Sequence, residues 1–216
     1  MSIRVVVADD HPAVLLGIIH ILDRYNSVEV VDTARNSDGI VETLTRAPCD
    51  VLITDYVMPG GSYEDGFSFI LFLRQKFPDL KIIVFTIVDD PNLLDLLSNI
   101  GVYSVVHKYD DPQKLCIAVI STESKEKFRS KLSQRELQVL SLHAYGVPTG
   151  EIAKQLNRSK QTISTQKVSA LKKLRIGNMV DFFCILHGHQ SFAPIEALQL
   201  SKDPAKNFDG NSTWIN

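Results

Sequence analysis

The chain has 216 residues, of which 44% are hydrophobic and 22% are charged, and this composition is ordinary for a globular protein of one or two domains. Its apolar runs fall well short of the roughly 20 residues of a transmembrane helix, and Met1-Ser2-Ile3-Arg4 leads into a strand without a signal-peptide core. We therefore expect a cytoplasmic protein with no membrane association. Three widely spaced cysteines in apolar surroundings are expected to be free, buried thiols: Cys49, Cys116 and Cys184.

Charge is unevenly distributed along the chain. Residues 1–120 contain 9 Lys and Arg against 17 Asp and Glu, whereas residues 121–178 contain 12 against 4. An acidic half followed by a basic segment predicts two domains, the second of which faces a polyanion. The expected division is a first domain over 1–121, a linker over 122–131, a second domain over 132–189 and a loosely ordered tail over 190–216.

Five apolar runs in the first domain, each followed by a stretch with helical spacing, predict an α/β fold with a parallel sheet. Because the runs are almost wholly apolar, helices should cover both faces of the sheet, and right-handed crossovers make this a doubly wound (βα)5 fold. The expected strands are 3–8, 28–33, 49–54, 80–86 and 103–108.

Polar side chains end four of these strands at one edge of the sheet. Asp9 and Asp10 follow the first strand, Asp55 follows the third, Thr86 ends the fourth and Lys108 ends the fifth. Each alone would be an ordinary turn or capping residue. Crowded carboxylates repel one another, so we expect Mg²⁺ at Asp9, Asp10 and Asp55. Thr86 and Lys108 are suited to hold the remaining oxygens of a phosphoryl group on Asp55.

These residues resemble the motif set of a two-component receiver domain, which comprises Asp9-Asp10-His11-Pro12, Asp55 with Met58-Pro59-Gly60, Thr86 and Lys108. The resemblance implies a flavodoxin-like domain in which Asp55 is the phosphoacceptor and Asp9 and Asp10 bind the metal. It also implies that Thr86 is the switch hydroxyl and that Lys108 is the phosphate partner.

Three valines distinguish this chain from the usual receiver pattern. Receivers usually carry Tyr or Phe three residues before the lysine, where this chain has Val105, so the threonine–aromatic coupling of the family must be altered. Val57 and Val88 occupy receiver positions from which a polar side chain can orient the hydrolytic water. We therefore expect slow loss of the phosphoryl group, although both valines could simply cover the sheet edge. A haloacid-dehalogenase-like phosphatase is disfavoured, because that class needs an aspartate where Val57 stands.

The basic segment predicts a helix-turn-helix. Ser133 and Glu136 form a capping-box pattern that begins one helix, Thr149 is placed to cap a short second helix, and Ser159 caps a third over 160–174. The third helix has an apolar stripe and a basic face, as a recognition helix in the DNA major groove does; the alternative is a solvated basic face. The side chains expected to contact DNA are Lys160, Ser164, Thr165, Lys167, Val168 and Lys172.

Residues 130–188 resemble the LuxR-type helix-turn-helix of the NarL/FixJ response regulators, on segments that include 132–136, 151–153 and 162–163. The resemblance implies an all-α domain that binds DNA, a sensor histidine kinase or phosphotransfer protein as phosphoryl donor, and a homodimer on phosphorylation. In such domains the helix after the recognition helix forms the dimer contact, so Phe183 and Leu186 are candidates, and core packing would suit them equally. The main alternative is a phosphorylation-independent regulator that acts as a heterodimer with an auxiliary transcription factor.

Overall fold

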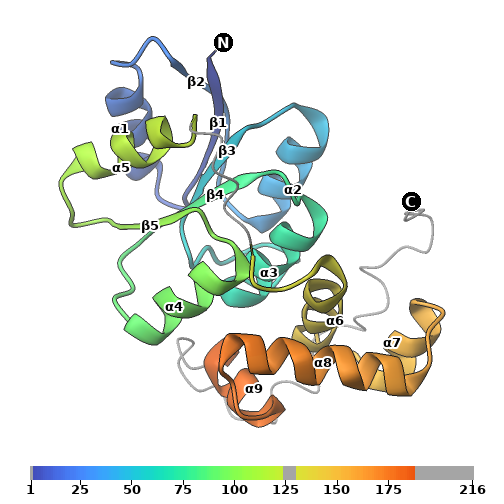
Figure 1. Cartoon of the computed structure of the whole chain (residues 1–216). Helices are drawn as coiled ribbons and strands as arrows, with labels where there is room; N and C mark the ends of the chain where they lie inside the picture. Colours follow the sequence, from blue (N-terminus) through green and yellow to red (C-terminus); the bar gives the residue numbers. More distant parts are fainter. Residues whose placement is uncertain (1, 124–129, 188–216) are drawn as a thin grey trace.

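The structure is a computed structural model that describes residues 2–123 and 130–187 (Figure 1). The predicted tail over 190–216 and most of the predicted linker lie outside the described residues. Within the described residues, no helix is both long enough and apolar enough to span a lipid bilayer.

The first domain is a five-stranded parallel sheet in the order β2-β1-β3-β4-β5. This order places the first strand between the second and third, as expected for a doubly wound fold. The strands are β1 (Ile3–Ala8), β2 (Val28–Ala34), β3 (Val51–Thr54), β4 (Lys81–Thr86) and β5 (Ser104–His107). The helices that follow them are α1 (Pro12–Leu22), α2 (Ser37–Arg46), α3 (Phe67–Lys76), α4 (Pro91–Ile100) and α5 (Pro112–Ser121).

Alternating side chains of each strand enter two cores on opposite faces of the sheet. On β1, Val5 and Val7 pack with α1 and α5, whereas Val6 and Ala8 pack with α2, α3 and α4. Both faces are therefore covered, which explains why the strands are apolar almost throughout. The predicted (βα)5 architecture is confirmed.

In the part of the chain that the structure describes, the second domain has four helices, and its first and third helices begin as predicted. Ser133 and Glu136 form a reciprocal capping box at the start of α6, and Ser159 Oγ accepts the Thr162 N–H at 3.1 Å at the start of α8. The prediction that Thr149 caps α7 is wrong. Pro148 takes the cap position, because its carbonyl accepts the N–H groups of Glu151 and Ile152 at 2.9 and 3.0 Å. The helices are α6 (Gln134–Ala144), α7 (Thr149–Gln155), α8 (Lys160–Leu174) and α9 (Met179–His187).

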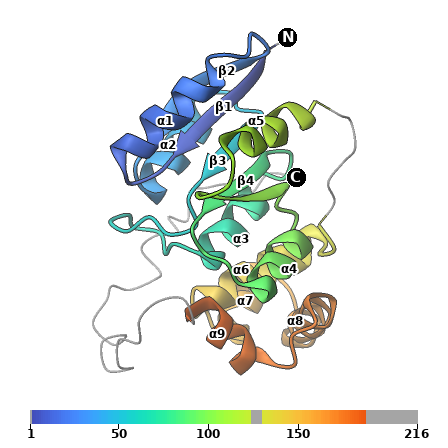
Figure 2. The same ribbon diagram turned by 90° about the vertical axis from the view of Figure 1, so that its left-hand side faces the viewer.

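The two domains pack against each other through helices. Figure 2 shows α6 to α9 beneath the receiver-like domain, next to α3 and α4. The apolar core on the α2–α4 face continues without a break into the second domain. Phe67 of α3 and Phe182 of α9 are both fully buried and meet edge to face, with ring centroids 6.2 Å apart. The sequence did not predict this shared core.

The cysteines differ from one another in exposure. Cys116 is buried, and Cys49 is half-buried with its thiol pKa raised to about 11 by burial. The prediction of a buried thiol is wrong for Cys184, which is exposed. α9 buries the side that carries Phe182 and Leu186, so Cys184 falls on the side facing away from that core.

Candidate functional site

The sheet ladder fixes the backbone of the acidic site. The Asp9 N–H donates to the Ala34 carbonyl at 3.1 Å, and the Asp55 N–H donates to the Ala8 carbonyl at 3.0 Å. The Lys108 N–H continues the same ladder at the far side of the site. Each residue follows directly on its strand, so all three side chains emerge at the carboxyl edge of the sheet, where open α/β folds bind ligands.

Lys108 bridges the two buried carboxylates of the site. Its Nζ lies 2.5 Å from Asp55 Oδ2 and 2.6 Å from Asp9 Oδ2. Burial lowers the pKa of Lys108, but the hydrogen bonds and charges of Asp55 and Asp9 outweigh burial and raise that pKa above its ordinary value. Lys108 therefore remains a cation and neutralises part of the negative charge of the pocket.

Asp9, Asp10 and His11 form a compact cluster of metal-ligating groups, with ligand atoms within 4.8 Å of one another. The Asp10 carboxylate is 2.8 Å from His11 Nδ1, and Asp9 Oδ1 accepts the His11 N–H at 2.9 Å. The fully buried Asp9 and the partly exposed Asp10 supply hard oxygen ligands, which suit Mg²⁺. A metal site formed by Asp9, Asp10 and Asp55 stays a prediction; in this structure Asp55, like Asp9, contacts Lys108. Sequence reasoning overlooked His11, although it directly follows the acidic pair.

Asp55 and Thr86 have different partners in the pocket. Asp55 Oδ1 accepts the Tyr56 N–H at 2.6 Å, which leaves Oδ2 for Lys108. The Thr86 hydroxyl is buried and accepts the Val88 N–H at 3.2 Å. The structure thus brings Asp9, Asp55 and Lys108 into direct contact. Thr86 lies at the same sheet edge, but its hydroxyl is hydrogen-bonded to Val88 in the loop that follows β4.

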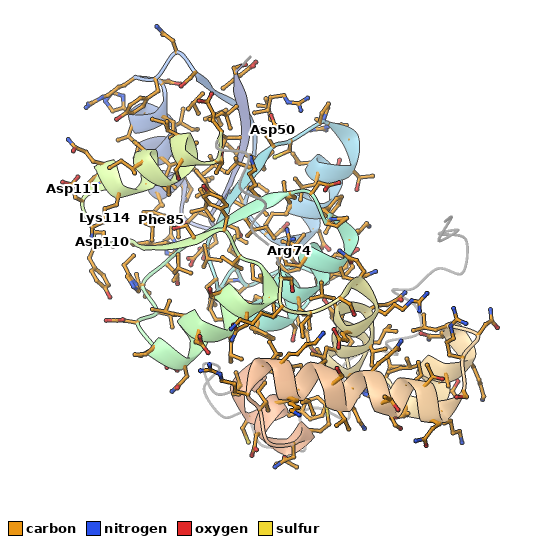
Figure 3. All side chains as sticks on the ribbon, viewed as in Figure 1. Asp50, Arg74, Phe85, Asp110, Asp111 and Lys114 are labelled. Carbon is orange, nitrogen blue, oxygen red and sulfur yellow. The ribbon has the colours of Figure 1, made fainter. Side chains whose placement is uncertain are left out.

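The loop after Lys108 is braced by its own charges. Lys114 Nζ lies 2.7 Å from Asp110 Oδ1, and Asp111 caps α5 by accepting the Gln113 N–H at 2.8 Å. Figure 3 shows Asp110, Asp111 and Lys114 together on the side of the domain away from α6 to α9. These contacts fix the start of α5.

The recognition-helix candidates lie on α8, with differing exposure. Lys160, Thr165 and Lys172 are exposed, as is Val168 with 61% of its surface accessible, whereas Ser164 and Lys167 are half-buried. Thr165 Oγ1 donates to the Gln161 carbonyl at 2.9 Å within the same helix. The basic face remains open while α9 is packed on α3. Four of the six predicted DNA-contacting side chains are therefore accessible at the surface in this structure.

The two candidate dimer residues lie in the apolar core that both domains share. Leu186 is 7% exposed, and Phe183 is partly buried against the same core. Val180 is the large apolar side chain that α9 leaves open, at 70% exposure. A dimer through Phe183 and Leu186 would therefore require α9 to leave its present packing.

An acidic pocket with a half-buried lysine and a buried hydroxyl at a sheet edge, joined to a basic helix-turn-helix, defines the class of phosphorylation-switched DNA-binding regulators. Two family models match this chain. The response regulator receiver domain matches residues 5–120, and the bacterial regulatory proteins of the luxR family match residues 130–186.

Named relatives match along most of the chain. It is 36% identical over 195 residues to the transcriptional regulatory protein RcsB of Escherichia coli K12, covering 82% of this chain and 90% of RcsB. It is 30% identical over 200 residues to the oxygen regulatory protein NreC of Staphylococcus carnosus, covering 80% and 91%. Among solved structures, the chain matches RcsB from Salmonella enterica serovar Typhimurium bound to promoter P1flhDC in the presence of the phosphomimetic BeF3⁻. The sequence identity is 35% and the TM-score is 0.55, and the match covers 87% of this chain and 100% of that one.

The chain belongs to the response regulators that join a receiver domain to a LuxR-type helix-turn-helix, and it is a phosphorylation-switched DNA-binding transcription regulator. Segments 60–66 and 157–167 resemble the Rcs phosphorelay regulator in particular, and the RcsB matches confirm that resemblance. A further structure, of two RcsB dimers bound to two parallel DNAs, has a TM-score of 0.58 at 35% identity, covering 88% of this chain and 100% of that one.

Proposed function

We propose that Asp55 accepts a phosphoryl group from the phosphohistidine of a sensor kinase or phosphotransfer protein in the cytoplasm. The phosphorus–nitrogen bond of the donor breaks as an Asp55 carboxylate oxygen forms the new phosphorus–oxygen bond. Mg²⁺, held by Asp9 and Asp10 with Asp55, would neutralise charge on the transferred group. The observation that carries the proposal is the contact of Lys108 Nζ with Asp55 Oδ2 at 2.5 Å.

Lys108 and Thr86 are the residues that respond to the new group. Lys108 exchanges its bond to the Asp55 carboxylate for one to a phosphoryl oxygen, because that oxygen carries more negative charge. The Thr86 hydroxyl, which accepts the Val88 N–H in this structure, turns to donate to another phosphoryl oxygen. Both changes occur at the sheet edge, and the second moves the loop before α4.

The output is promoter binding by a homodimer through α8. Lys160, Lys167 and Lys172 neutralise phosphates, while Ser164, Thr165 and Val168 contact base edges. Phosphorylation favours a dimer that uses Phe183 and Leu186 after α9 leaves α3. The two recognition helices of the dimer then bind adjacent half-sites. Because binding of the second helix becomes intramolecular, a modest increase in dimer affinity produces a large increase in promoter occupancy.

Gel-shift measurements on genomic fragments, with and without acetyl phosphate, test this function. The wild-type chain should bind more tightly after acetyl phosphate treatment, and Asp55→Ala should lose that response while keeping its unstimulated affinity. Release of inorganic phosphate over many turnovers would instead indicate a phosphatase.

A second function is favoured by the open face of α8 in the unmodified chain. Because Val168 and Lys172 are already exposed, the chain could contribute a recognition helix to a heterodimer with an auxiliary transcription factor without phosphorylation. Promoter occupancy of Asp55→Ala equal to that of the wild type in cells would support this function over the phosphorylation switch.

A further inference from the structure

The domains meet through apolar contacts on both the α3 side and the α4 side. A pocket of about 590 Å³ lies beside α4, the end of α8 and α9, and its lining includes the charged residues Asp90, Asp95 and Arg175. Its apolar lining comes from both domains and consists of Leu93, Leu96, Leu174, Ile176 and Ile185. On the α3 side, Phe67 and Phe182 meet with no exposed surface on either ring. Close-packed contacts such as this ring pair transmit small displacements.

Tyr56 connects the phosphoacceptor to that close-packed side. Its N–H donates to Asp55 Oδ1 at 2.6 Å, and its carbonyl accepts the Gly66 N–H at 2.9 Å, just before α3 begins. The Tyr56 side chain is 3% exposed, and a Cβ on Gly66 would lie 3.4 Å from its Cζ and Oη atoms. Burial raises the pKa of the Tyr56 phenol, and the backbone N–H of Phe67 lowers that pKa by a smaller amount. The ring therefore lies directly against the first turn of α3.

The loop between Asp55 and α3 also faces the second domain. Burial raises the pKa of the Tyr145 phenol at the end of α6, and so do the nearby Glu64 carboxylate and Tyr63. A shift in the loop or in the first turn of α3 would therefore be felt by both α6 and α9. Val105 stands where receivers usually carry the switching aromatic residue, and it is part of the same apolar core.

We propose that Tyr56 and Phe67 couple the modification of Asp55 to the docking of α9 through Phe182, in place of the threonine–aromatic route. The inference rests on the proposed function. In the unmodified chain, Tyr56 supports the start of α3 and Phe67 holds Phe182, so α9 stays packed and Leu186 stays covered. A phosphoryl group on Asp55 displaces Lys108 and the Asp55–Tyr56 peptide. The Tyr56 ring then shifts against Gly66, and the Phe67–Phe182 contact loosens.

The test measures self-association of the full chain by sedimentation velocity, with and without BeF3⁻ and Mg²⁺. The wild type should associate at least about tenfold more tightly with the phosphomimetic. Without BeF3⁻, Phe67→Leu should self-associate nearly as tightly as the wild type does with BeF3⁻. Adding BeF3⁻ to this variant should therefore change its association constant by no more than about threefold. Tyr56→Phe keeps the ring and should retain part of the response, whereas Tyr56→Leu should lose most of it. In a double-mutant cycle, the effects of Tyr56→Leu and Phe67→Leu on the response should not add.

Phe72→Leu is the matched control. Phe72 lies on the same helix and is buried, and its ring neighbours include Tyr63, Phe69 and Lys76 of the receiver. This variant should keep the wild-type response, and ¹⁹F NMR should show BeF3⁻ bound to all variants. A full response in both Phe67→Leu and Tyr56→Leu overturns the proposed coupling while the switch itself stands. A wild type that binds BeF3⁻ without any change in association overturns the switch and the coupling together.

A rival route runs through the end of α4 and gives the test a second arm. The Lys131 N–H donates to the Asn99 carbonyl at 2.9 Å, and a Cβ on Gly101 would lie 3.1 Å from Ser130 Cβ. Gly101→Ala would disturb this link to the second domain without touching Phe67. Loss of the BeF3⁻ response in Gly101→Ala, together with a full response in Phe67→Leu, would assign the coupling to α4 and refute the role of Tyr56 and Phe67.

Discussion

Lys108 holds Asp55 with Nζ 2.5 Å from Oδ2, and the same ammonium group lies 2.6 Å from Asp9. One cation therefore neutralises two buried carboxylates in the unmodified protein. Mg²⁺ entering the pocket would share this neutralising role, whereas a phosphoryl group would add negative charge that Lys108 must also neutralise. Lys108 thus links the stability of the receiver to its chemistry.

Lys108→Ala should destabilise the chain by about 1–3 kcal/mol in the absence of Mg²⁺, because it leaves two buried carboxylates without their cation. Adding Mg²⁺ should recover more stability in this variant than in the wild type, since the metal no longer competes with the ammonium group. Thermal unfolding with and without MgCl₂ measures both effects. The control is Lys114→Ala, which removes a lysine from a partly exposed pair with Asp110. Equal Mg²⁺ responses in all three proteins would contradict the prediction.

Much of the receiver could be predicted from the sequence because its signals are local. Wholly apolar strands require cover on both faces, and parallel strands bring their carboxyl ends to one edge. These two rules sufficed to bring Asp9, Asp55 and Lys108 together. The capping box of Ser133 and Glu136 is similarly local, and it formed as predicted.

The packing between the domains could not be predicted, because it depends on contacts between distant segments. The apolar residues of α9 indicate burial, yet nothing in their spacing says which surface covers them. Phe182 could have packed within its own domain, but it meets Phe67 of the receiver. Thr149 failed as a cap for a local reason, because the neighbouring Pro148 carbonyl accepted the first helical hydrogen bonds instead.

Glu136→Gln should destabilise the helix-turn-helix by about 1–3 kcal/mol at neutral pH. The carboxylate accepts bonds from Lys173 Nζ at 2.6 Å, Ser169 Oγ at 2.7 Å and the Ser133 N–H at 2.7 Å, and so ties α6 to α8. Burial raises the pKa of Glu136, but these bonds outweigh burial and lower it to about 2.

The stabilisation by Glu136 has a defined pH window. Its pKa is depressed in the folded state, so the stabilisation is complete above about pH 4.5 and is lost as the pH falls towards 2. Chemical denaturation at pH 5 and pH 3 should therefore show the difference between wild type and Glu136→Gln shrinking at the lower pH. Glu151→Gln, which removes an exposed pair with Lys154, is the control. A difference that stays constant with pH would refute the assignment.

His143→Leu should make the stability of the chain less sensitive to mild acid. Burial and the charge of Lys167 lower the pKa of His143 to about 4, from an ordinary value of 6.5. The folded state therefore favours the neutral ring, and its stability falls as the pH drops from 6.5 towards 4. Between pH 7.5 and pH 5, this residue should account for a loss of about 1–2 kcal/mol, as measured by denaturant unfolding. The control is His20→Gln, which replaces an exposed histidine and should lose as much stability between pH 7.5 and pH 5 as the wild type does. If His143→Leu also lost as much stability as the wild type, this role of His143 would be refuted.

Val57→Asn should shorten the lifetime of the phosphorylated protein by about tenfold or more, because an amide near Asp55 can orient the attacking water. Val57 is 39% exposed, so the change should not disturb the core. Loss of labelled phosphate from purified protein measures the rate. Val57→Ala is the control, since it opens the site without adding a polar group. If Val57→Ala accelerated the loss as much as Val57→Asn, steric cover and not water orientation would set the lifetime.

Lys160→Ala and Lys172→Ala should each weaken DNA binding by the BeF3⁻-treated protein, by a similar factor on every promoter sequence. Both side chains are exposed on α8, and a lysine that neutralises a phosphate releases counterions when it binds. Each variant should therefore reduce the slope of log affinity against log salt concentration by about 0.9. Val168→Ala should instead change the preference among sequences and leave the salt slope intact. Lys114→Ala, on the side of the receiver away from α8, is the matched lysine control (Figure 3). An unchanged salt slope in both α8 lysine variants would exclude these side chains from the DNA interface.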